Sequence, residues 1–78
     1  MIIYNVELRN KYMQVLAYTS TIDIEQARNF AIDNIGSFDN WRVIAKEKND
    51  RGNYVITNIW NSIQCKIEDI GNEEFAIY

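Results

Sequence analysis

Few residues of this chain have side chains that could carry out catalysis. The chain has no histidine, a single cysteine (Cys65) and no glycine-rich loop, so nucleophile–base pairs, zinc sites and phosphate cradles are not expected. The neighbouring carboxylates Glu68-Asp69 and Glu73-Glu74 could hold a cation or exchange protons. Because neighbours in a strand point to opposite faces, we interpret them as solvated edge charges. The sequence predicts no enzyme, no catalytic residue, no metal site and no cofactor.

The chain is richer in residues suited to binding than in residues suited to catalysis. Tyrosine, tryptophan and arginine are the types that concentrate binding energy in interfaces. If Arg42 lies beside Trp60 and Lys48 beside Tyr54, each pair would form a cation–aromatic contact worth about 0.5–1 kcal/mol when exposed. Such pairs could stabilise the sheet itself as well as contact a partner. The predicted partner-binding residues are the basic and aromatic side chains of one sheet face: Arg42, Lys46, Lys48, Tyr54, Trp60, Tyr12 and Tyr18.

The first two strands that would position these side chains are predicted from alternation. From Ile2 to Arg9, apolar and more polar residues alternate, as is typical of a half-buried strand. A two-residue turn at Asn10-Lys11 would lead into a second strand, Tyr12 to Thr19. This turn predicts three apolar cross-strand pairs, Leu8 with Met13, Val6 with Val15 and Tyr4 with Ala17.

The helix has the clearest boundaries. Asp23 suits the N-cap, and Gln26 follows three residues later as in a capping box. Gly36 can take the left-handed conformation that ends a helix after Ile35. The apolar stripe expected to face the sheet consists of Ile24, Ala27, Phe30 or Ala31, and Ile35.

Two further strands, Trp41 to Lys48 and Tyr54 to Trp60, are predicted around the loop Asn49–Asn53, where Gly52 suits a turn with a bulge. If Lys48 lies opposite Tyr54, alternation divides the side chains between two faces. The face toward the helix would carry Trp41, Val43, Ala45, Val55, Thr57 and Ile59. The outer face would carry Arg42, Ile44, Lys46, Lys48, Tyr54, Ile56, Asn58 and Trp60.

A fifth strand is predicted from Ile63 to Asp69, followed by a short edge segment, Phe75–Tyr78. A two-residue turn at Asn61-Ser62 would point Ile63 and its alternate neighbours outward, whereas a longer loop would point them inward. We favour the inward direction, and the outward one stays open. The predicted fold class is α+β, with one helix packed on a mainly antiparallel sheet of four to six strands, in the order β-β-α-β-β-β.

The composition predicts a single domain over residues 1–78, because no change in composition marks a boundary. Eight basic and eleven acidic residues give a net charge of −3, which argues against nucleic acid as a partner. Basic residues gather in the middle of the chain and acidic ones near its end, so we expect a basic and an acidic surface. No signal peptide and no membrane span of ~20 apolar residues is found. Together with the single cysteine, this predicts a cytoplasmic location. Thirteen isoleucines and ten asparagines, with no proline and no histidine, are typical of an AT-rich coding sequence and fit a bacterial host cell.

The predicted helix of about 13 residues would be roughly 20 Å long and could cover only one face of the sheet. The other face would meet water, a second copy of the chain or a foreign partner. All three occupants remain open from the sequence.

The segments YMQVLAYTSTIDIEQARNFAIDNIG and WRVIAKEK follow a strand-strand-helix-strand-strand order between Ile2 and Trp60. In this order, in size and in a helix entry with Thr21, Glu25 and Ala27, the chain resembles small phage and mobile-element proteins of the anti-CRISPR type. The resemblance implies a stoichiometric inhibitor that occupies a nucleic-acid channel or an assembly surface of a host defence complex. It assigns no functional residue.

We therefore expect a small binding protein that inhibits a bacterial defence complex of the host through protein–protein contact. One alternative is a homodimeric accessory or structural protein whose uncovered sheet faces pair. Another is a small regulator that binds single-stranded nucleic acid.

Overall fold

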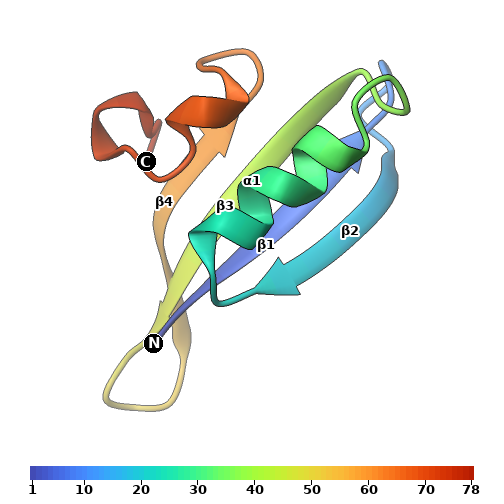
Figure 1. Cartoon of the computed structure of the whole chain (residues 1–78). Coiled ribbons are helices and arrows are strands. Elements are labelled where there is room, and N and C mark those ends of the chain that lie inside the picture. Colours follow the sequence, from blue (N-terminus) through green and yellow to red (C-terminus); the bar gives the residue numbers. More distant parts are fainter.

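The computed structural model describes residues 1–78 and shows an α+β fold, with one helix on a four-stranded antiparallel sheet (Figure 1). The strand order is β2-β1-β3-β4. The elements are β1 (Ile2–Arg9), β2 (Val15–Thr21), α1 (Ile24–Asp33), β3 (Asn40–Lys48) and β4 (Tyr54–Asn61), followed by two 3-10 turns, Ile67–Asp69 and Glu73–Phe75. No helix has the length and apolar composition needed to span a bilayer.

The core lies between the sheet and the segments that cover one of its faces. In β1, the two-residue period of a strand brings both Val6 and Leu8 under α1. In α1, Ala27 and Ala31 are one turn apart, and their small side chains let the helix approach the sheet closely. The core consists of nine buried residues: Val6, Leu8, Ala27, Ala31, Trp41, Val43, Ala45, Trp60 and Ile70.

The helix begins as predicted and ends two residues early. Asp23 is the N-cap, and its side chain accepts a hydrogen bond from the backbone N–H of Glu25 at 2.9 Å. Gln26 does not complete a capping box, because its Oε1 accepts a hydrogen bond from Thr21 Oγ1 at 2.8 Å. The chain leaves the helix after Asp33. The predicted packing of Ile35 on the sheet is therefore wrong, and this side chain is exposed.

The pairing of β1 with β2 differs from the predicted register. Leu8 lies opposite Ala17 and Val6 opposite Thr19, each four residues away from the predicted partner. The second strand starts at Val15 instead of Tyr12. Because the shift is an even number of residues, the predicted division of side chains between the two faces holds from Ala17 to Thr19. A further register shift between Leu8 and Arg9 places Val15 opposite Arg9, so Val15 does not share the face of Val6 as predicted.

Both hairpin loops are built in the same way around an asparagine. Asn10 Oδ1 accepts hydrogen bonds from the backbone N–H groups two and four residues later, at 2.9 and 3.1 Å. Asn49 Oδ1 does the same at 3.0 Å each. The fourth residue of each loop has a positive φ, 67° at Met13 and 84° at Gly52. The predicted loop at Asn49 is confirmed, and the predicted two-residue turn at Asn10 is wrong because this asparagine closes a longer loop.

A bulge at Thr57 breaks the predicted alternation of β4. Lys48 lies opposite Tyr54 as predicted, but Thr57 has no partner in β3. One extra residue reverses the direction of every later side chain in the strand. Ile59 therefore points away from the helix and Trp60 points into the core, which is the reverse of the predicted arrangement.

The predicted fifth strand, Ile63 to Asp69, does not form. The backbone N–H of Lys66 donates to Asp69 Oδ2 at 3.0 Å, a local bond that competes with strand pairing and closes a 3-10 turn. The predicted edge segment Phe75–Tyr78 is also irregular, with one backbone hydrogen bond from Ile77 to β4. The sheet therefore has four strands.

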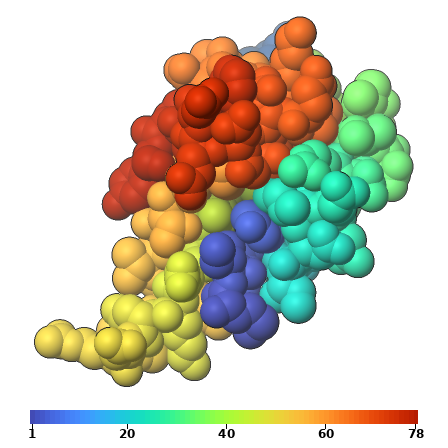
Figure 2. All heavy atoms as spheres, turned by 60° about the vertical axis from the view of Figure 1, so that its left-hand side comes forward, coloured from blue at the N-terminus to red at the C-terminus, as the bar shows by residue number.

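The C-terminal segment, residues 62–78, covers the part of the sheet that α1 does not reach. The indole Nε1 of Trp60 donates to the backbone carbonyl of Asn72 at 2.8 Å, and Arg28 Nε on α1 donates to the carbonyl of Ile70 at 2.9 Å. Figure 2 shows the segment, in orange and red, next to the helix, in teal. The helix and the C-terminal segment thus cover the same face of the sheet.

Candidate binding face of the sheet

The face of the sheet that points away from α1 is left uncovered by the rest of the chain (Figure 1). We call it the open face. Because residues paired across strands share a face, its members follow from the register. They are Ile3, Asn5, Glu7 and Arg9 of β1; Val15, Tyr18 and Ser20 of β2; Asn40, Arg42, Ile44, Lys46 and Lys48 of β3; and Tyr54, Ile56, Ile59 and Asn61 of β4.

Aliphatic side chains occupy the centre of the open face. Ile44 and Ile59 lie opposite each other, and Ile3 and Ile56 lie on either side of Lys46. All four isoleucines are half-buried by their neighbours on the same face. An apolar centre with a polar border is typical of a protein interaction surface.

Charged residues are divided unevenly between the open face and the rest of the molecule. The open face carries four basic side chains, Arg9, Arg42, Lys46 and Lys48, and one carboxylate, Glu7, which gives a net charge of +3. The other four basic and ten acidic residues give −6, and the two parts together make the −3 of the whole chain. The open face therefore favours approach to an acidic surface.

Only one of these four basic side chains has an ionic partner within the chain. Arg42 Nη2 lies 2.7 Å from Glu7 Oε1, and Arg42 Nε donates to the same oxygen at 2.8 Å. Lys46 and Lys48 form no ion pair, and Arg9 Nε is buried without a hydrogen-bond partner. Three cationic groups of the open face thus remain free of carboxylates.

A buried asparagine lies near the middle of the open face. Asn5 is 9% exposed, and its Oδ1 accepts hydrogen bonds from Tyr18 Oη at 3.1 Å and Ser20 Oγ at 2.7 Å. The two hydroxyls are 2.8 Å apart. This network fixes one end of the Asn5 amide, and the Nδ2 end has no partner in the chain.

Five of the seven predicted binding residues lie together on the open face. Arg42, Lys46 and Lys48 alternate along β3. Tyr54 lies opposite Lys48 at one end of this face, and Tyr18 lies opposite Glu7 on the far side. The basic and aromatic side chains are therefore spread around the aliphatic centre.

The other two predicted binding residues, Trp60 and Tyr12, lie elsewhere. Placing Trp60 on the outer face is wrong, because the bulge in β4 turns it into the core, where it is 2% exposed. The predicted contact between Arg42 and Trp60 is therefore also wrong. Tyr12 lies in the loop between β1 and β2, where Lys11 Nζ is 5.2 Å from the centre of its ring.

The predicted binding set does not include Asn5, Ser20 or Ile59. A polar residue on the outer side of a strand normally indicates solvent, so the sequence gives no sign that Asn5 is buried. Its burial depends on Tyr18 and Ser20, and therefore on the register of β2. Ile59 reaches the open face only because of the bulge, for which the sequence has no clear signal.

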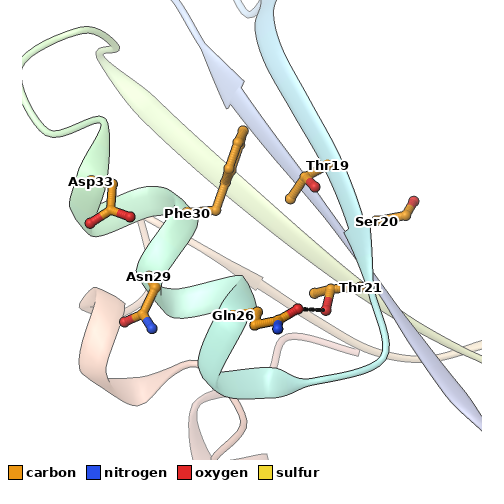
Figure 3. A pocket seen from close by; sticks show the side chains of 7 residues that line it. All are labelled: Thr19, Ser20, Thr21, Gln26, Asn29, Phe30 and Asp33. Carbon is orange, nitrogen blue, oxygen red and sulfur yellow. Dashed lines mark hydrogen bonds between the residues drawn. The ribbon is translucent and has the colours of Figure 1, made fainter.

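Away from the open face, a hollow of about 270 Å³ lies between α1 and β2 (Figure 3). Its walls are mainly hydroxyls and amides, together with one carboxylate and one aromatic ring, from Thr19, Ser20, Thr21, Gln26, Asn29, Phe30 and Asp33. The side chains of Thr21 and Gln26 are hydrogen-bonded to each other. Figure 3 shows the side chain of Ser20 pointing away from the helix. The hollow has no cationic group and gathers no set of groups suited to chemistry.

The single thiol lies at the edge of the core. Burial raises the pKa of Cys65; a hydrogen bond with the backbone of Asn61 lowers it, and the carboxylate of Asp69 raises it. A protonated thiol is a poor nucleophile. Cys65 and Ile67 pack against the core as in the favoured inward arrangement, whereas Ile63 is 71% exposed.

Comparison of the chain with protein-family models, with curated proteins and with solved structures finds no match. What the chain does must therefore be argued from the shape and chemistry of the open face.

Proposed function

We propose that this protein is a non-enzymatic binding protein that docks its open face onto an acidic surface of another protein. The division of charge carries the proposal, with +3 on the uncovered aliphatic face and −6 on the rest of the chain. Complementary charge steers such a partner to this face and away from the acidic one.

The aliphatic centre favours a protein over single-stranded nucleic acid. Sheets that bind single strands stack bases on aromatic side chains. Here Ile44 and Ile59 occupy the central positions, and the hydroxyl of Tyr18 is held by Asn5. The net charge of −3 also opposes a phosphate backbone at long range.

The size of the open face sets the strength of binding that can be expected. Strands of about eight residues are ~26 Å long, and four strands cover ~19 Å, so the flat area is roughly 500 Å². An interface burying this area on both partners would total about 1,000 Å², the lower limit for a specific complex. A stable complex therefore requires the partner to cover the whole face.

As the partner we propose a bacterial defence complex, which the protein would inhibit by occupying one of its surfaces. This part of the proposal is supported by the small size of the chain, by its lack of catalytic side chains and by its resemblance to anti-CRISPR proteins. The cytoplasm of the bacterial host is where such a complex would be met.

The test is binding of the purified protein to a panel of immobilised defence complexes, measured by biolayer interferometry. The open-face double variant Ile44→Thr/Lys48→Glu should bind at least about tenfold more weakly, a loss of ~1.4 kcal/mol. The matched control Ile63→Thr/Lys66→Glu makes the same changes on the C-terminal segment, where both side chains are exposed, and should bind normally. Equal binding by both variants would exclude the open face.

Self-association is a second candidate, and the edge strand β2 favours it. Pairing two open faces would bring two surfaces of net +3 together, which is unfavourable. The outer edge of β2 instead carries no charged residue and no proline between Val15 and Thr21, so a second copy could extend the sheet there. Light scattering at micromolar concentration should then give twice 9.2 kDa. Leu16→Lys should restore the monomer, and a monomeric wild-type protein would exclude this candidate.

A further inference from the structure

A hollow of about 260 Å³ lies on the open face. It is lined by Ile3, Asn5, Ser20, Lys46 and Tyr54. Ile3 and Lys46 are cross-strand neighbours, and Asn5 and Ser20 are as well. Four strands therefore contribute to one small site.

The hollow presents hydrogen-bond donors and no carboxylate. The Lys46 ammonium has no ion pair, and the Nδ2 end of the nine-tenths buried Asn5 amide has no partner. The hydroxyl of Ser20 is already bonded to Asn5. The carboxylate on the same face, Glu7, is held by Arg42.

We propose that this hollow receives the carboxylate of one aspartate or glutamate side chain of the partner protein. Lys46 Nζ would supply the opposite charge, and Asn5 Nδ2 would supply a donor whose amide is already oriented by the Tyr18 and Ser20 hydroxyls. Fixing a donor before binding reduces the entropy lost on association. In naming a protein as the source of the carboxylate, this inference rests on the proposed function.

A carboxylate fits this hollow better than a phosphate of a nucleic acid. The hollow holds a single cation, and a phosphate chain requires several along its path. Next to Lys46 lie the aliphatic side chains of Ile3 and Ile56, which suit apolar residues on either side of an acidic one. Charged hydrogen bonds of this kind are also among the stronger ones in proteins.

The test uses the isolated protein and short probes. The amide and Lys46 side-chain resonances are followed by NMR during titration with the tripeptide acetyl-Leu-Glu-Leu-amide. The control probe, acetyl-Leu-Gln-Leu-amide, has the same shape without the charge. Saturable shifts confined to the residues of the hollow are expected for the glutamate probe, with affinity about tenfold above that for the glutamine probe. Equal affinity for the two probes would overturn the proposal.

Two variants separate the roles of the donors. Asn5→Asp keeps the shape of the side chain and its bonds with the hydroxyls but places a negative charge in the hollow, so it should abolish the shifts. Lys46→Gln removes the cation and should weaken binding by about tenfold, whereas Lys66→Gln, on the opposite side, should leave it unchanged. Unchanged titration of both hollow variants would contradict the assignment.

Further titrations distinguish this proposal from its rivals and from the proposed function. A thymidine oligonucleotide that binds the hollow more tightly than the glutamate probe would assign it to nucleic acid instead. If no defence complex binds the protein but the glutamate titration succeeds, the acid-binding hollow stands and the proposed partner falls. If a complex binds through the open face while the titration fails, the hollow is not the acidic subsite.

Discussion

Trp60 shows most clearly how one residue can be misplaced by an otherwise correct pattern. The hairpin between β3 and β4 has the predicted loop and the predicted first pair, Lys48 with Tyr54. The residue inserted at Thr57 then exchanges the faces of Ile59 and Trp60. A tryptophan suited to a binding surface thus becomes part of the core, and an isoleucine takes its place on the open face.

Replacing Trp60 by alanine should therefore destabilise the protein by about 3–5 kcal/mol, because it opens a large cavity and leaves the carbonyl of Asn72 without its donor. Tyr12→Ala, at a side chain that is 72% exposed, should cost no more than about 1 kcal/mol. Urea denaturation measures both. Similar losses for the two variants would place Trp60 at the surface.

Met13 occupies the backbone conformation that glycine occupies in the other hairpin loop. Its φ of 67° is unfavourable for a side chain, whereas Gly52 adopts 84° without strain. We expect Met13→Gly to stabilise the protein by about 0.5–1 kcal/mol and Gly52→Ala to destabilise it by at least a similar amount. Thermal unfolding tests the pair, and a less stable Met13→Gly protein would show that the methionine side chain contributes more than its backbone costs.

The Cys65 thiol should give a measurable pH dependence. Because its pKa is raised in the folded state, the unfolded thiol ionises first as pH rises above its ordinary pKa of 9.0. The stabilising contribution is then complete below that pH and is lost as pH rises through the folded pKa. Cys65→Ala should therefore show a weaker fall in unfolding free energy between pH 8 and 10.5, in denaturation at each pH. Parallel pH profiles would contradict the raised pKa.

Among the elements, those fixed by local signals could be predicted and those fixed by tertiary contacts could not. Asp23 gave the start of α1, and Gly52 gave the second hairpin loop. The register of β2 could not be read, because Asn10 closes a loop that resembles a tight turn in sequence. The alternation from Ile63 to Asp69 suited a strand, but the segment forms turns that place Ile70 in the core. For the site, the basic residues of β3 were found, and Asn5 was missed because its burial depends on that register.

The docking of the C-terminal segment on α1 depends on the close approach at Gly71. Its φ is 98°, and an added Cβ would lie 3.0 Å from Ile24 Cγ1 and 3.1 Å from Arg28 Nη2. Gly36 has a similar φ of 91° with no atom within 4 Å of such a Cβ. Gly71→Ala should therefore cost about 1 kcal/mol more than Gly36→Ala. Equal losses of unfolding free energy for the two variants in urea denaturation would mean that the C-terminal segment can move away from α1 without loss of packing.

For the molecule as a whole, the side formed by α1 and the C-terminal segment differs chemically from the side formed by the open face. The helix and the C-terminal segment bury the core, and most of the acidic residues lie on loops or on that side. The opposite side combines half-buried isoleucines, three free cations and an oriented asparagine amide. This separation of charge, by which an acidic chain presents a net positive face, is the basis of the proposed docking.

The most direct test of the proposed docking is phage plating on bacteria that carry a defence system bound by the protein in the panel. Cells expressing the wild-type protein or the control Ile63→Thr/Lys66→Glu should allow the phage to plate as if the defence were absent. Cells expressing Ile44→Thr/Lys48→Glu should block it again, at equal levels of folded protein. Full inhibition by the open-face variant, or its loss in the control alone, would contradict docking through the open face.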